Sequence, residues 1–249
     1  MSVRVHTRGQ GVDLALLHGW GLRAAVWDAL AEELARDFRV HVVDWCAGEP
    51  STPAALVEEL AAALPPALTV CGWSLGGQLA LAWARARPRQ VERLVLLAST
   101  PRFVSSGDWQ AGMPLQIFDA FAAGVAADAP HALQRFLALQ ADGDAAGRAV
   151  LRRLRNVLED GGAPPAATLS TTLQWLANTD LEPLLADIRQ PALVVHGARD
   201  GVIPPAAGAH LAAALVRAEL FTIDGAAHAP FIEREALLAQ RIREWHERH

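Results

Sequence analysis

Ser74 stands in a short pattern that nucleophilic chemistry can use. Residues 72–76 read GWSLG, so Gly72 lies two positions before the serine and Gly76 two positions after it. An apolar run precedes this segment and helical spacing follows it, so the chain must turn sharply at the serine. The tip of such a turn is driven toward positive φ, and flanking glycines relieve the crowding there. The pattern predicts a serine nucleophile raised above a sheet edge, and the alternative is a glycine-lined turn with a solvent-facing serine.

A serine hydroxyl also needs a base within hydrogen-bond reach and a third group that orients that base. Among the nine histidines, His228 is the candidate base, because IDGAAHAPF places it just after the last predicted strand. Asp200 is the candidate acid, because GARDGV places it just after the preceding strand. Both therefore lie at the same sheet edge as Ser74, in the chain order Ser, Asp, His. Asp224 is nearer to His228 but precedes the turn, and the structural alternative for His228 and Asp200 is helix capping.

Acyl transfer also needs donors for the negative charge that develops on the carbonyl oxygen. The backbone N–H of Leu75, directly after the nucleophile, is one candidate. The backbone N–H of Trp20 is the other, because HGWG at residues 18–21 forms a compact turn after an apolar strand. His18, at the start of that turn, is interpreted as a structural histidine and is assigned no chemical step.

An alternation of strands and helices positions these residues. Short runs rich in Val and Leu, typical of strands buried on both faces, alternate with longer segments at helical spacing. The predicted strands are 14–18, 39–45, 68–72, 93–99, 192–197 and 219–223, with 3–6 as a further edge strand. The predicted helices are 24–36, 54–64, 75–87, 206–215 and 231–247. The alternation predicts an α/β fold with a doubly wound, mostly parallel sheet.

The segment 101–181 interrupts this alternation. It contains no convincing strand, and it predicts four helices at 114–127, 130–141, 144–159 and 165–178. An all-helical insert between two strands of a sheet is typical of a cap, or lid. We therefore expect one α/β core made of residues 1–100 and 182–249, with a helical cap at 101–181.

Composition argues against several classes of protein. The 249 residues carry a net charge of −5, and all 22 basic residues are arginine, so the acidic balance argues against nonspecific nucleic-acid binding. Charged residues or prolines interrupt every apolar run before it could span a bilayer. The N-terminal residues lack the apolar core of a secretory signal, so we expect a cytoplasmic protein. Cys46 and Cys71 lie in apolar runs without metal-ligand spacing, which predicts two buried thiols, no metal and no cofactor.

The segments LLHGWG, GWSLGG, GARDGVIP and GAAHAPF together resemble the α/β-hydrolase superfamily across almost the whole chain. The longer segments LLHGWGLRAAVWDALAEEL, VLLASTPRF and RFLALQ narrow the resemblance to the carboxylesterases of biotin synthesis that cut the methyl ester of pimeloyl-acyl-carrier protein. The resemblance implies an α/β-hydrolase fold, an esterase activity and an acyl-carrier protein as partner. It also implies a nucleophile at Ser74, an acid at Asp200, a base at His228 and oxyanion donors at Trp20 and Leu75.

In the cap, the resemblance implies two further groups of residues. The residues that match the wall of the family's acyl channel are Phe136, Leu137, Ala138, Leu139 and Gln140, with Trp20 and Leu75 from the core. The residues at or near the arginines that grip the acidic carrier are Arg135, Arg148 and Arg152.

The charge pattern of the cap is consistent with an acidic partner. Arg148, Arg152 and Arg155 fall at positions i, i+4 and i+7, so they share one helix face, beside an apolar face of leucines. Residues 131–155 hold five Arg and two Asp, a local balance of +3 in a chain whose total is −5. Such a patch attracts an acidic protein, and the alternative is an ordinary solvated helix face.

Two other functions stay open at this point. A broad carboxylesterase, or a C–C bond or lactone hydrolase, would use the same three residues and differ in the cap pocket. A noncatalytic ligand-binding protein of the same fold is the other possibility.

The chain also departs from the family after Asp44, where DWCAGEPSTPAAL predicts a shortened loop and leaves the shape of one pocket wall open. We expect a monomer.

Overall fold

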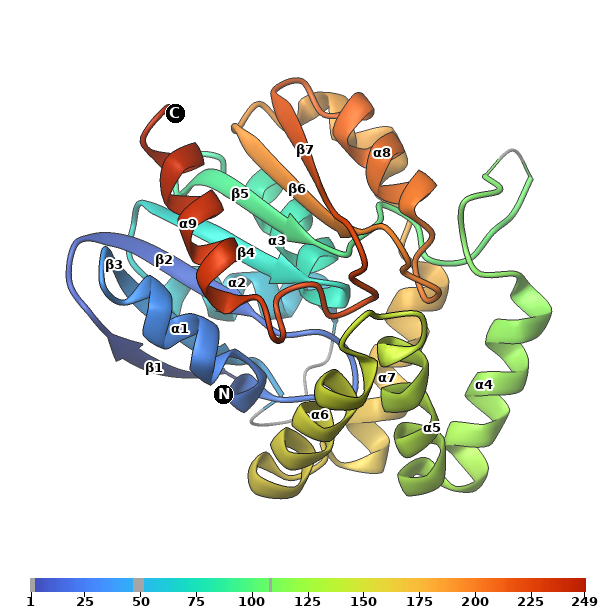
Figure 1. Cartoon of the computed structure of the whole chain (residues 1–249). Coiled ribbons are helices and arrows are strands. Elements are labelled where there is room, and N and C mark those ends of the chain that lie inside the picture. The colour runs from blue at the N-terminus through green and yellow to red at the C-terminus, as the bar shows by residue number, and fades with distance from the viewer. Residues whose placement is uncertain (1–2, 47–51, 108) are drawn as a thin grey trace.

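The computed structural model describes residues 3–46, 52–107 and 109–249. Its centre is a seven-stranded sheet in the order β1-β3-β2-β4-β5-β6-β7 (Figure 1). The strands are β1 (Arg4–Arg8), β2 (Val12–Leu17), β3 (Phe38–Asp44), β4 (Leu68–Trp73), β5 (Val91–Leu97), β6 (Ala192–Gly197) and β7 (Ala218–Ile223). β1 pairs antiparallel with β3, and the remaining neighbours pair parallel. The predicted α/β fold and the edge position of the first strand are confirmed.

Helices cover both faces of the sheet, and its central strands are accordingly buried along their whole length. All six residues of β4 and all six of β6 are buried. The helices outside the 101–181 segment are η1 (Ala24–Trp27), α1 (Asp28–Leu34), α2 (Pro53–Ala63), α3 (Leu75–Ala86), η2 (Glu182–Asp187), α8 (Pro205–Ala214) and α9 (Glu235–His246). α1 and α9 pack on one face, and α2, α3 and α8 pack on the other (Figure 1). This two-sided burial explains why the strands read as continuous Val and Leu runs.

Four α-helices lie in the described part of residues 101–181, between β5 and β6. They are α4 (Leu115–Ala127), α5 (Ala129–Ala141), α6 (Gly147–Gly161) and α7 (Ala166–Asn178). They gather beyond the end of the sheet toward which the parallel strands point (Figure 1). Loops that follow parallel strands emerge at that end, so these helices stand over those loops. Residues 101–181 are called the cap segment below.

Three predicted helices are wrong at their boundaries, among them the helix predicted at 144–159, which begins only at Gly147. The helix predicted at 231–247 begins only at Glu235. Phe231 and Ile232 are buried in turns, and Glu233 takes a φ of 64°, which is incompatible with a right-handed helix. The helix predicted at 24–36 is divided between η1 and α1 and ends at the end of α1.

Other sequence expectations concern thiols, one loop, membranes and metals. Cys46 and Cys71 are free and buried, as predicted. The loop predicted to be shortened after Asp44 includes residues 47–51, which lie outside the described residues. Within the three described ranges, no helix is long and apolar enough to cross a membrane. Those ranges also contain no group of three or more His, Cys, Asp or Glu residues that could hold a metal ion.

Candidate active site

Ser74 occupies the tight turn between β4 and α3. Its φ of 55° and ψ of −117° confirm the predicted positive φ, a conformation that costs a non-glycine residue energy. A Cβ on Gly72 would lie 2.3 Å from Gly76 O, and a Cβ on Gly76 would lie 2.2 Å from Leu17 O. Glycine is therefore required on both sides of the serine. Ser99 Oγ donates to Ser74 O (2.9 Å), which fixes the turn from the segment just after β5.

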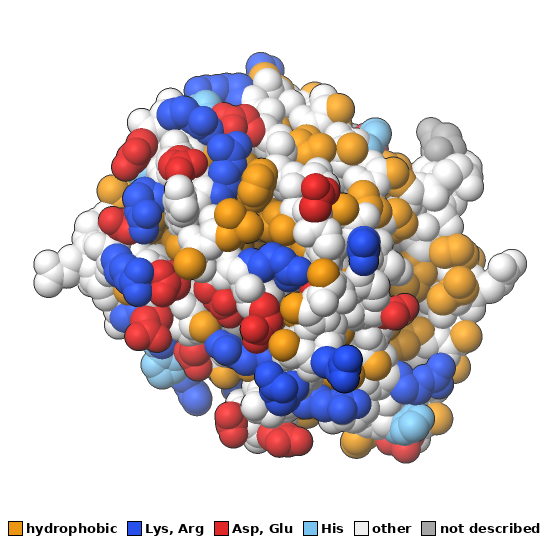
Figure 2. Space-filling view, in the orientation of Figure 1, with side chains coloured by type: hydrophobic (Ala, Val, Ile, Leu, Met, Phe, Trp, Pro, Cys, Tyr) orange, Lys and Arg blue, Asp and Glu red, His pale blue; other side chains and the backbone are white. Residues whose placement is uncertain are grey.

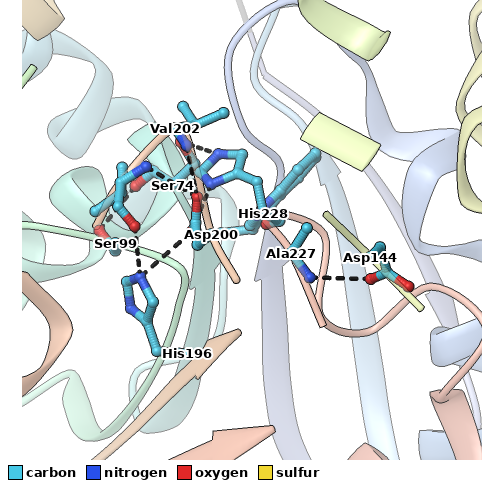
Figure 3. A network of polar contacts seen from close by, with 10 residues as sticks. Ser74, Ser99, Asp144, His196, Asp200, Val202, Ala227 and His228 are labelled. Carbon is cyan, nitrogen blue, oxygen red and sulfur yellow. Dashed lines mark hydrogen bonds and ion pairs between the residues drawn. The ribbon is translucent and has the colours of Figure 1, made fainter. Parts of the chain in front are cut away.

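The side chains of Ser74, His228 and Asp200 form one chain of hydrogen bonds (Figure 3). Ser74 Oγ lies 3.1 Å from His228 Nε2, and His228 Nδ1 lies 2.9 Å from Asp200 Oδ2. The three residues follow β4, β7 and β6, whose carboxyl ends meet at one edge of the parallel sheet. All three are buried, at 6%, 1% and 4% exposure respectively. The structure thus brings together the three residues that the sequence singles out.

Asp200 accepts hydrogen bonds at both carboxylate oxygens. Oδ1 accepts from the N–H groups of Val202 and Ile203, both at 2.9 Å. Oδ2 accepts from His228, and His196 Nε2 lies 3.3 Å from the same oxygen. Burial raises the pKa of Asp200, but the charge of His228 and the hydrogen bonds from His196 and His228 outweigh burial and hold this pKa well below its usual range. Asp200 therefore stays ionised near neutral pH and can orient the imidazole.

The loop that carries His228 is fixed through its backbone. We call residues 224–234, between β7 and α9, the base loop. The N–H of His228 donates to Gln140 O (3.2 Å), and its C=O accepts from Trp73 Nε1 (2.8 Å). The N–H of Ala227 donates to Asp144 Oδ2 (2.9 Å), as Figure 3 shows. The cap segment therefore contacts the candidate base directly.

The two predicted oxyanion donors lie beside the nucleophile. Leu75 is the first residue of α3, so its N–H has no acceptor within the helix. A Cβ on Gly19 would lie 3.3 Å from Ser74 Cβ, so the loop that carries Trp20 passes next to Ser74. Among the described residues, neither the Trp20 nor the Leu75 N–H donates to a backbone carbonyl. Both amides are free to donate to a substrate carbonyl oxygen.

A buried polar cluster supports the loop of Trp20. His18 stacks on Trp45 at 4.5 Å and donates from Nδ1 to Gly19 O (2.9 Å). His18 Nε2 lies 3.7 Å from Asp44 Oδ1, while Arg23 donates twice to Asp44 Oδ2, at 3.0 and 2.6 Å. Burial raises the pKa of Asp44, but His18 and Arg23 outweigh burial and lower it to about 2. The structural role predicted for His18 fits this arrangement.

A cavity of about 860 Å³ joins Ser74 to the cap segment. Its apolar lining includes Phe103, Met113, Ile117, Phe121, Leu173 and Leu176. Trp20 lines the cavity from the core side and packs edge-on against Phe121 and Phe136, with ring centroids 5.4 and 5.2 Å apart. Trp20 Nε1 donates to Leu169 O (3.0 Å), which ties the loop after β2 to α7. An acyl chain fits such a lining, because the walls offer few polar groups.

The predicted channel residues do not all face this cavity. Phe136, Ala138 and Leu139 line it. Leu137 and Gln140 are fully buried and are not among the lining residues, because five consecutive helical positions cannot point in one direction. Leu137 packs in the core on the side of α1 and α9 instead. The uniform assignment of residues 136–140 to the channel wall is therefore wrong for these two side chains.

The four predicted docking arginines are exposed on α5 and α6. Arg135 lines the cavity from α5, and Arg148, Arg152 and Arg155 lie on the outer face of α6. Figure 2 shows basic side chains gathered over α6 at the lower edge of the molecule. Within the described part of the chain, no ion pair involves any of these four arginines. The opposite face of α6 is apolar, with Leu154 fully buried.

Two residues without a predicted catalytic role support the candidate triad: His196 contacts Asp200, and Asp144 contacts the base loop next to His228. His196 donates from Nε2 to Ile203 O (2.9 Å) and lies beside Asp200. In the sequence, the only indication of this contact is that His196 lies at the end of a predicted strand, four residues before Asp200. Asp144 contacts the base loop from 83 positions away along the chain, a separation that no local pattern reveals.

Comparisons with known proteins show the family and the fold of this chain. A family model described as alpha/beta hydrolase fold matches residues 14–235, and the chain belongs to that family. The chain is 39% identical to a pimeloyl-[acyl-carrier protein] methyl ester esterase of Nitrosomonas europaea, covering 93% of this chain and 94% of the relative. It is 42% identical to the protein of that name from Xanthomonas campestris pv. campestris, covering 94% of each chain. An esterase from Exiguobacterium antarcticum shares the fold, with a TM-score of 0.85 at 19% identity over 98% of this chain and 94% of that one.

Proposed function

We propose that this protein is a serine carboxylesterase that hydrolyses the methyl ester of pimeloyl-acyl-carrier protein, a step of biotin synthesis. The observation that carries the proposal is the hydrogen-bonded set of Ser74, His228 and Asp200 at the apolar cavity. The relatives named above as pimeloyl-[acyl-carrier protein] methyl ester esterases support the choice of substrate. Such a reaction takes place where the biosynthetic carrier is found, in the cytoplasm.

The proposed chemistry has two steps, acylation and deacylation. Ser74 Oγ attacks the ester carbonyl while its proton passes to His228 Nε2. The N–H groups of Trp20 and Leu75 stabilise the oxyanion, and Asp200 stabilises the imidazolium. His228 then gives the proton to the departing methoxide, which leaves as methanol. Water repeats the sequence on the acyl-serine, which releases the carboxylic acid and restores Ser74.

In the proposed reaction, the core and the cap segment have different tasks. Residues 1–100 and 182–249 supply the reacting groups, and residues 101–181 supply the acyl cavity and the carrier contact. The apolar cavity would hold the carbon chain, with Phe136 and Leu139 in its wall. Exposed arginines on α5 and α6 would attract the acidic carrier, because no ion pair with described residues neutralises them.

The test compares two substrates and two serines. One reaction contains the methyl ester bound to the carrier protein, and the other contains the free methyl ester without the carrier. Release of methanol is measured in both reactions, and the mass of the carrier is measured in the first. We expect turnover with preference for the carrier-bound ester, and loss of turnover in Ser74→Ala. Ser170→Ala, which changes an exposed serine on α7, is the matched control. Equal turnover of both esters would instead define a broad carboxylesterase, and no turnover with Ser74 labelled by a fluorophosphonate would define a binding protein.

A genetic test addresses the proposed pathway directly. The gene should restore growth without biotin to a bacterial strain that lacks its own pimeloyl-carrier methyl esterase. The Ser74→Ala variant, produced at the same level, should not restore growth. Growth with the variant would contradict the proposed chemistry.

A further inference from the structure

The turn between α5 and α6 makes several contacts with the base loop. This turn, residues 142–146, is called the cap turn below. The N–H of Ala145 donates to Gly225 O (2.7 Å), and Asp144 accepts the N–H of Ala227 (2.9 Å). Just before the cap turn, Gln140 O accepts the N–H of His228 (3.2 Å). Positions 225, 227 and 228 of the base loop therefore all bond to one short stretch of the cap segment.

Asp144 is the centre of these contacts. Its Oδ1 accepts from the N–H of Ala146 (2.7 Å) and from Arg234 Nη2 (2.9 Å). Its Oδ2 accepts from the N–H of Ala227 (2.9 Å) and from Arg234 Nη1 (3.2 Å). The Asp144 side chain is 1% exposed and that of Arg234 is 14% exposed, so water does not replace these bonds. Both oxygens of the carboxylate are thus used, each by one backbone amide and one guanidinium nitrogen.

Arg234 closes the base loop on itself. It stands at the end of the loop, directly before α9, and also donates to Gly225 O and Ile232 O, both at 3.3 Å. The guanidinium therefore joins both ends of the loop to Asp144. A planar guanidinium that bonds a carboxylate through two nitrogens fixes direction as well as distance.

We propose that Asp144 and Arg234 form a clasp through which the cap segment positions His228 for catalysis. Asp144 is then a positioning residue: it touches no substrate and acts through the backbone next to the base. The clasp holds the imidazole at 3.1 Å from Ser74 Oγ, where proton transfer requires it. The cap segment accordingly has a second task besides enclosing the acyl chain. This inference rests on the proposed esterase chemistry, whatever the natural ester is.

The Asp144→Asn variant tests the clasp. An amide offers one oxygen where the carboxylate offers two, so either Ala146 or Ala227 meets an NH₂ group instead of an acceptor. A shifted imidazole lowers the chemical rate but leaves the acyl cavity unchanged. We expect kcat for a short p-nitrophenyl ester to fall about 10- to 100-fold. KM should change by less than about twofold, because uniform binding is unaffected.

A matched control separates positioning from loss of any ion pair. Arg153 of α6 pairs with Glu235 of α9 at 3.8 Å, close to the clasp in the chain but without a bond to the base loop. Arg153→Gln should therefore keep the kcat of the parent. Arg234→Lys retains the charge but loses the two-pronged contact, so its kcat should fall between the parent and Asp144→Asn. Parent-like kcat in a folded Asp144→Asn protein would overturn the proposal.

The double variant Asp144→Asn with Arg234→Gln separates the positioning role of Asp144 from the stability that its ion pair with Arg234 provides. In Asp144→Asn alone, the guanidinium is left without its counterion, which lowers stability by itself. The double variant removes that unpaired charge, so Tm should recover while kcat stays low. If kcat recovers together with Tm, the positioning role is wrong. If Asp144→Asn alone does not fold, the double variant decides by the same two outcomes.

A spectroscopic measurement keeps this test independent of the proposed function. The proton between His228 Nδ1 and Asp200 Oδ2 gives a strongly downfield proton NMR resonance when the imidazole is fixed. We expect this resonance to broaden or vanish in Asp144→Asn and to persist in Arg153→Gln. If the parent protein hydrolyses no ester, the proposed function fails, while the resonance still tests the clasp. An unchanged resonance in Asp144→Asn would overturn the clasp alone.

Discussion

Asp200 at the sheet edge and Arg148 on the cap segment are charged groups in opposite surroundings. Asp200 is 4% exposed and is surrounded by backbone and imidazole donors. Arg148 is exposed and has no ion-pair partner among the described residues. The first charge is held in one position before any substrate arrives, which is what a proton transfer requires. The second is left free, which suits a charge that attracts a partner from a distance.

The same contrast extends to the walls of the candidate site. The loops after β4, β6 and β7 are held by hydrogen bonds to neighbouring strands and to one another, and Trp45 Nε1 donates to His18 O in the loop after β2. The cavity wall in α4, α5 and α7 consists mostly of apolar side chains that pack without directional bonds. Changes at the sheet edge should therefore act on the rate of chemistry, whereas changes in the cap segment should act on which ester is accepted. The clasp of Asp144 and Arg234 is the exception, because it belongs to the cap segment but acts on the base.

The largest expected effect is at the sheet edge, in Asp200→Asn. The amide keeps the shape of the side chain but cannot stabilise the imidazolium or hold the same tautomer of His228. We expect kcat/KM for p-nitrophenyl esters to fall by about 10⁴, the loss seen when a triad carboxylate becomes an amide. Asp13→Asn removes a different carboxylate, one that lies 2.6 Å from His41 and far from the site, and should leave kcat/KM unchanged. Equal losses in the two variants would contradict the assignment of Asp200.

The next largest effect is a loss of stability when Asp44, which supports the loop of Trp20, is replaced. Its folded pKa of about 2 lies below the unfolded value, so its contribution is fully present above an unfolded pKa of about 3.9 and is lost as the pH falls toward 2. Asp44→Asn should therefore lower the free energy of unfolding by about 2 kcal/mol at pH 7. Urea unfolding of both proteins between pH 7 and pH 2.5 measures this difference. A gap that does not narrow below about pH 4 would contradict the proposed charge interaction.

Local patterns were enough to predict the sheet edge. The pattern around Ser74 is a local backbone requirement, so five consecutive residues reveal it. Asp200 and His228 could be placed because parallel strands end at one edge, so that position along the chain predicts position in space. The strands were equally readable, since burial on both faces leaves continuous apolar runs. The meeting of Ser74, Asp200 and His228 at one edge could therefore be predicted from the strands that they follow.

The cap segment could be predicted only as a set of helices. Which side of α5 meets the cavity depends on how the helices rotate against one another, so Leu137 and Gln140 could not be separated from Phe136 and Leu139. The apolar faces of α4 and α7 look like any buried helix face, so their contribution to the cavity was missed. Asp144 and Arg234 are 90 positions apart, and neither has a local motif that indicates the other.

A smaller effect is expected from the arginines of α6. The double variant Arg148→Glu with Arg152→Glu reverses two exposed charges without touching the cavity or the sheet edge. We expect kcat/KM for the carrier-bound methyl ester to fall about 10-fold or more at low salt, because steering of an acidic protein is lost. Turnover of the free methyl ester should stay at the parent level. This loss of kcat/KM should become smaller as salt is added. A loss that does not depend on the salt concentration would contradict electrostatic docking.

The smallest expected change in activity comes from Leu139 on the cavity side of α5, and Leu137 on the other side of this helix provides the contrast. Leu139 lines the cavity and is 39% exposed, whereas Leu137 is fully buried on the opposite side. Leu139→Ala should lower the free energy of unfolding by less than about 1 kcal/mol, since little buried surface is lost. It should nevertheless reduce kcat/KM for a hexanoyl ester more than for an acetyl ester, because only the longer chain reaches this wall. Leu137→Ala should show the opposite behaviour, with a stability loss of about 2–5 kcal/mol and an unchanged preference between the two esters. If Leu139→Ala leaves the preference for chain length unchanged, the acyl chain does not follow this wall of the cavity.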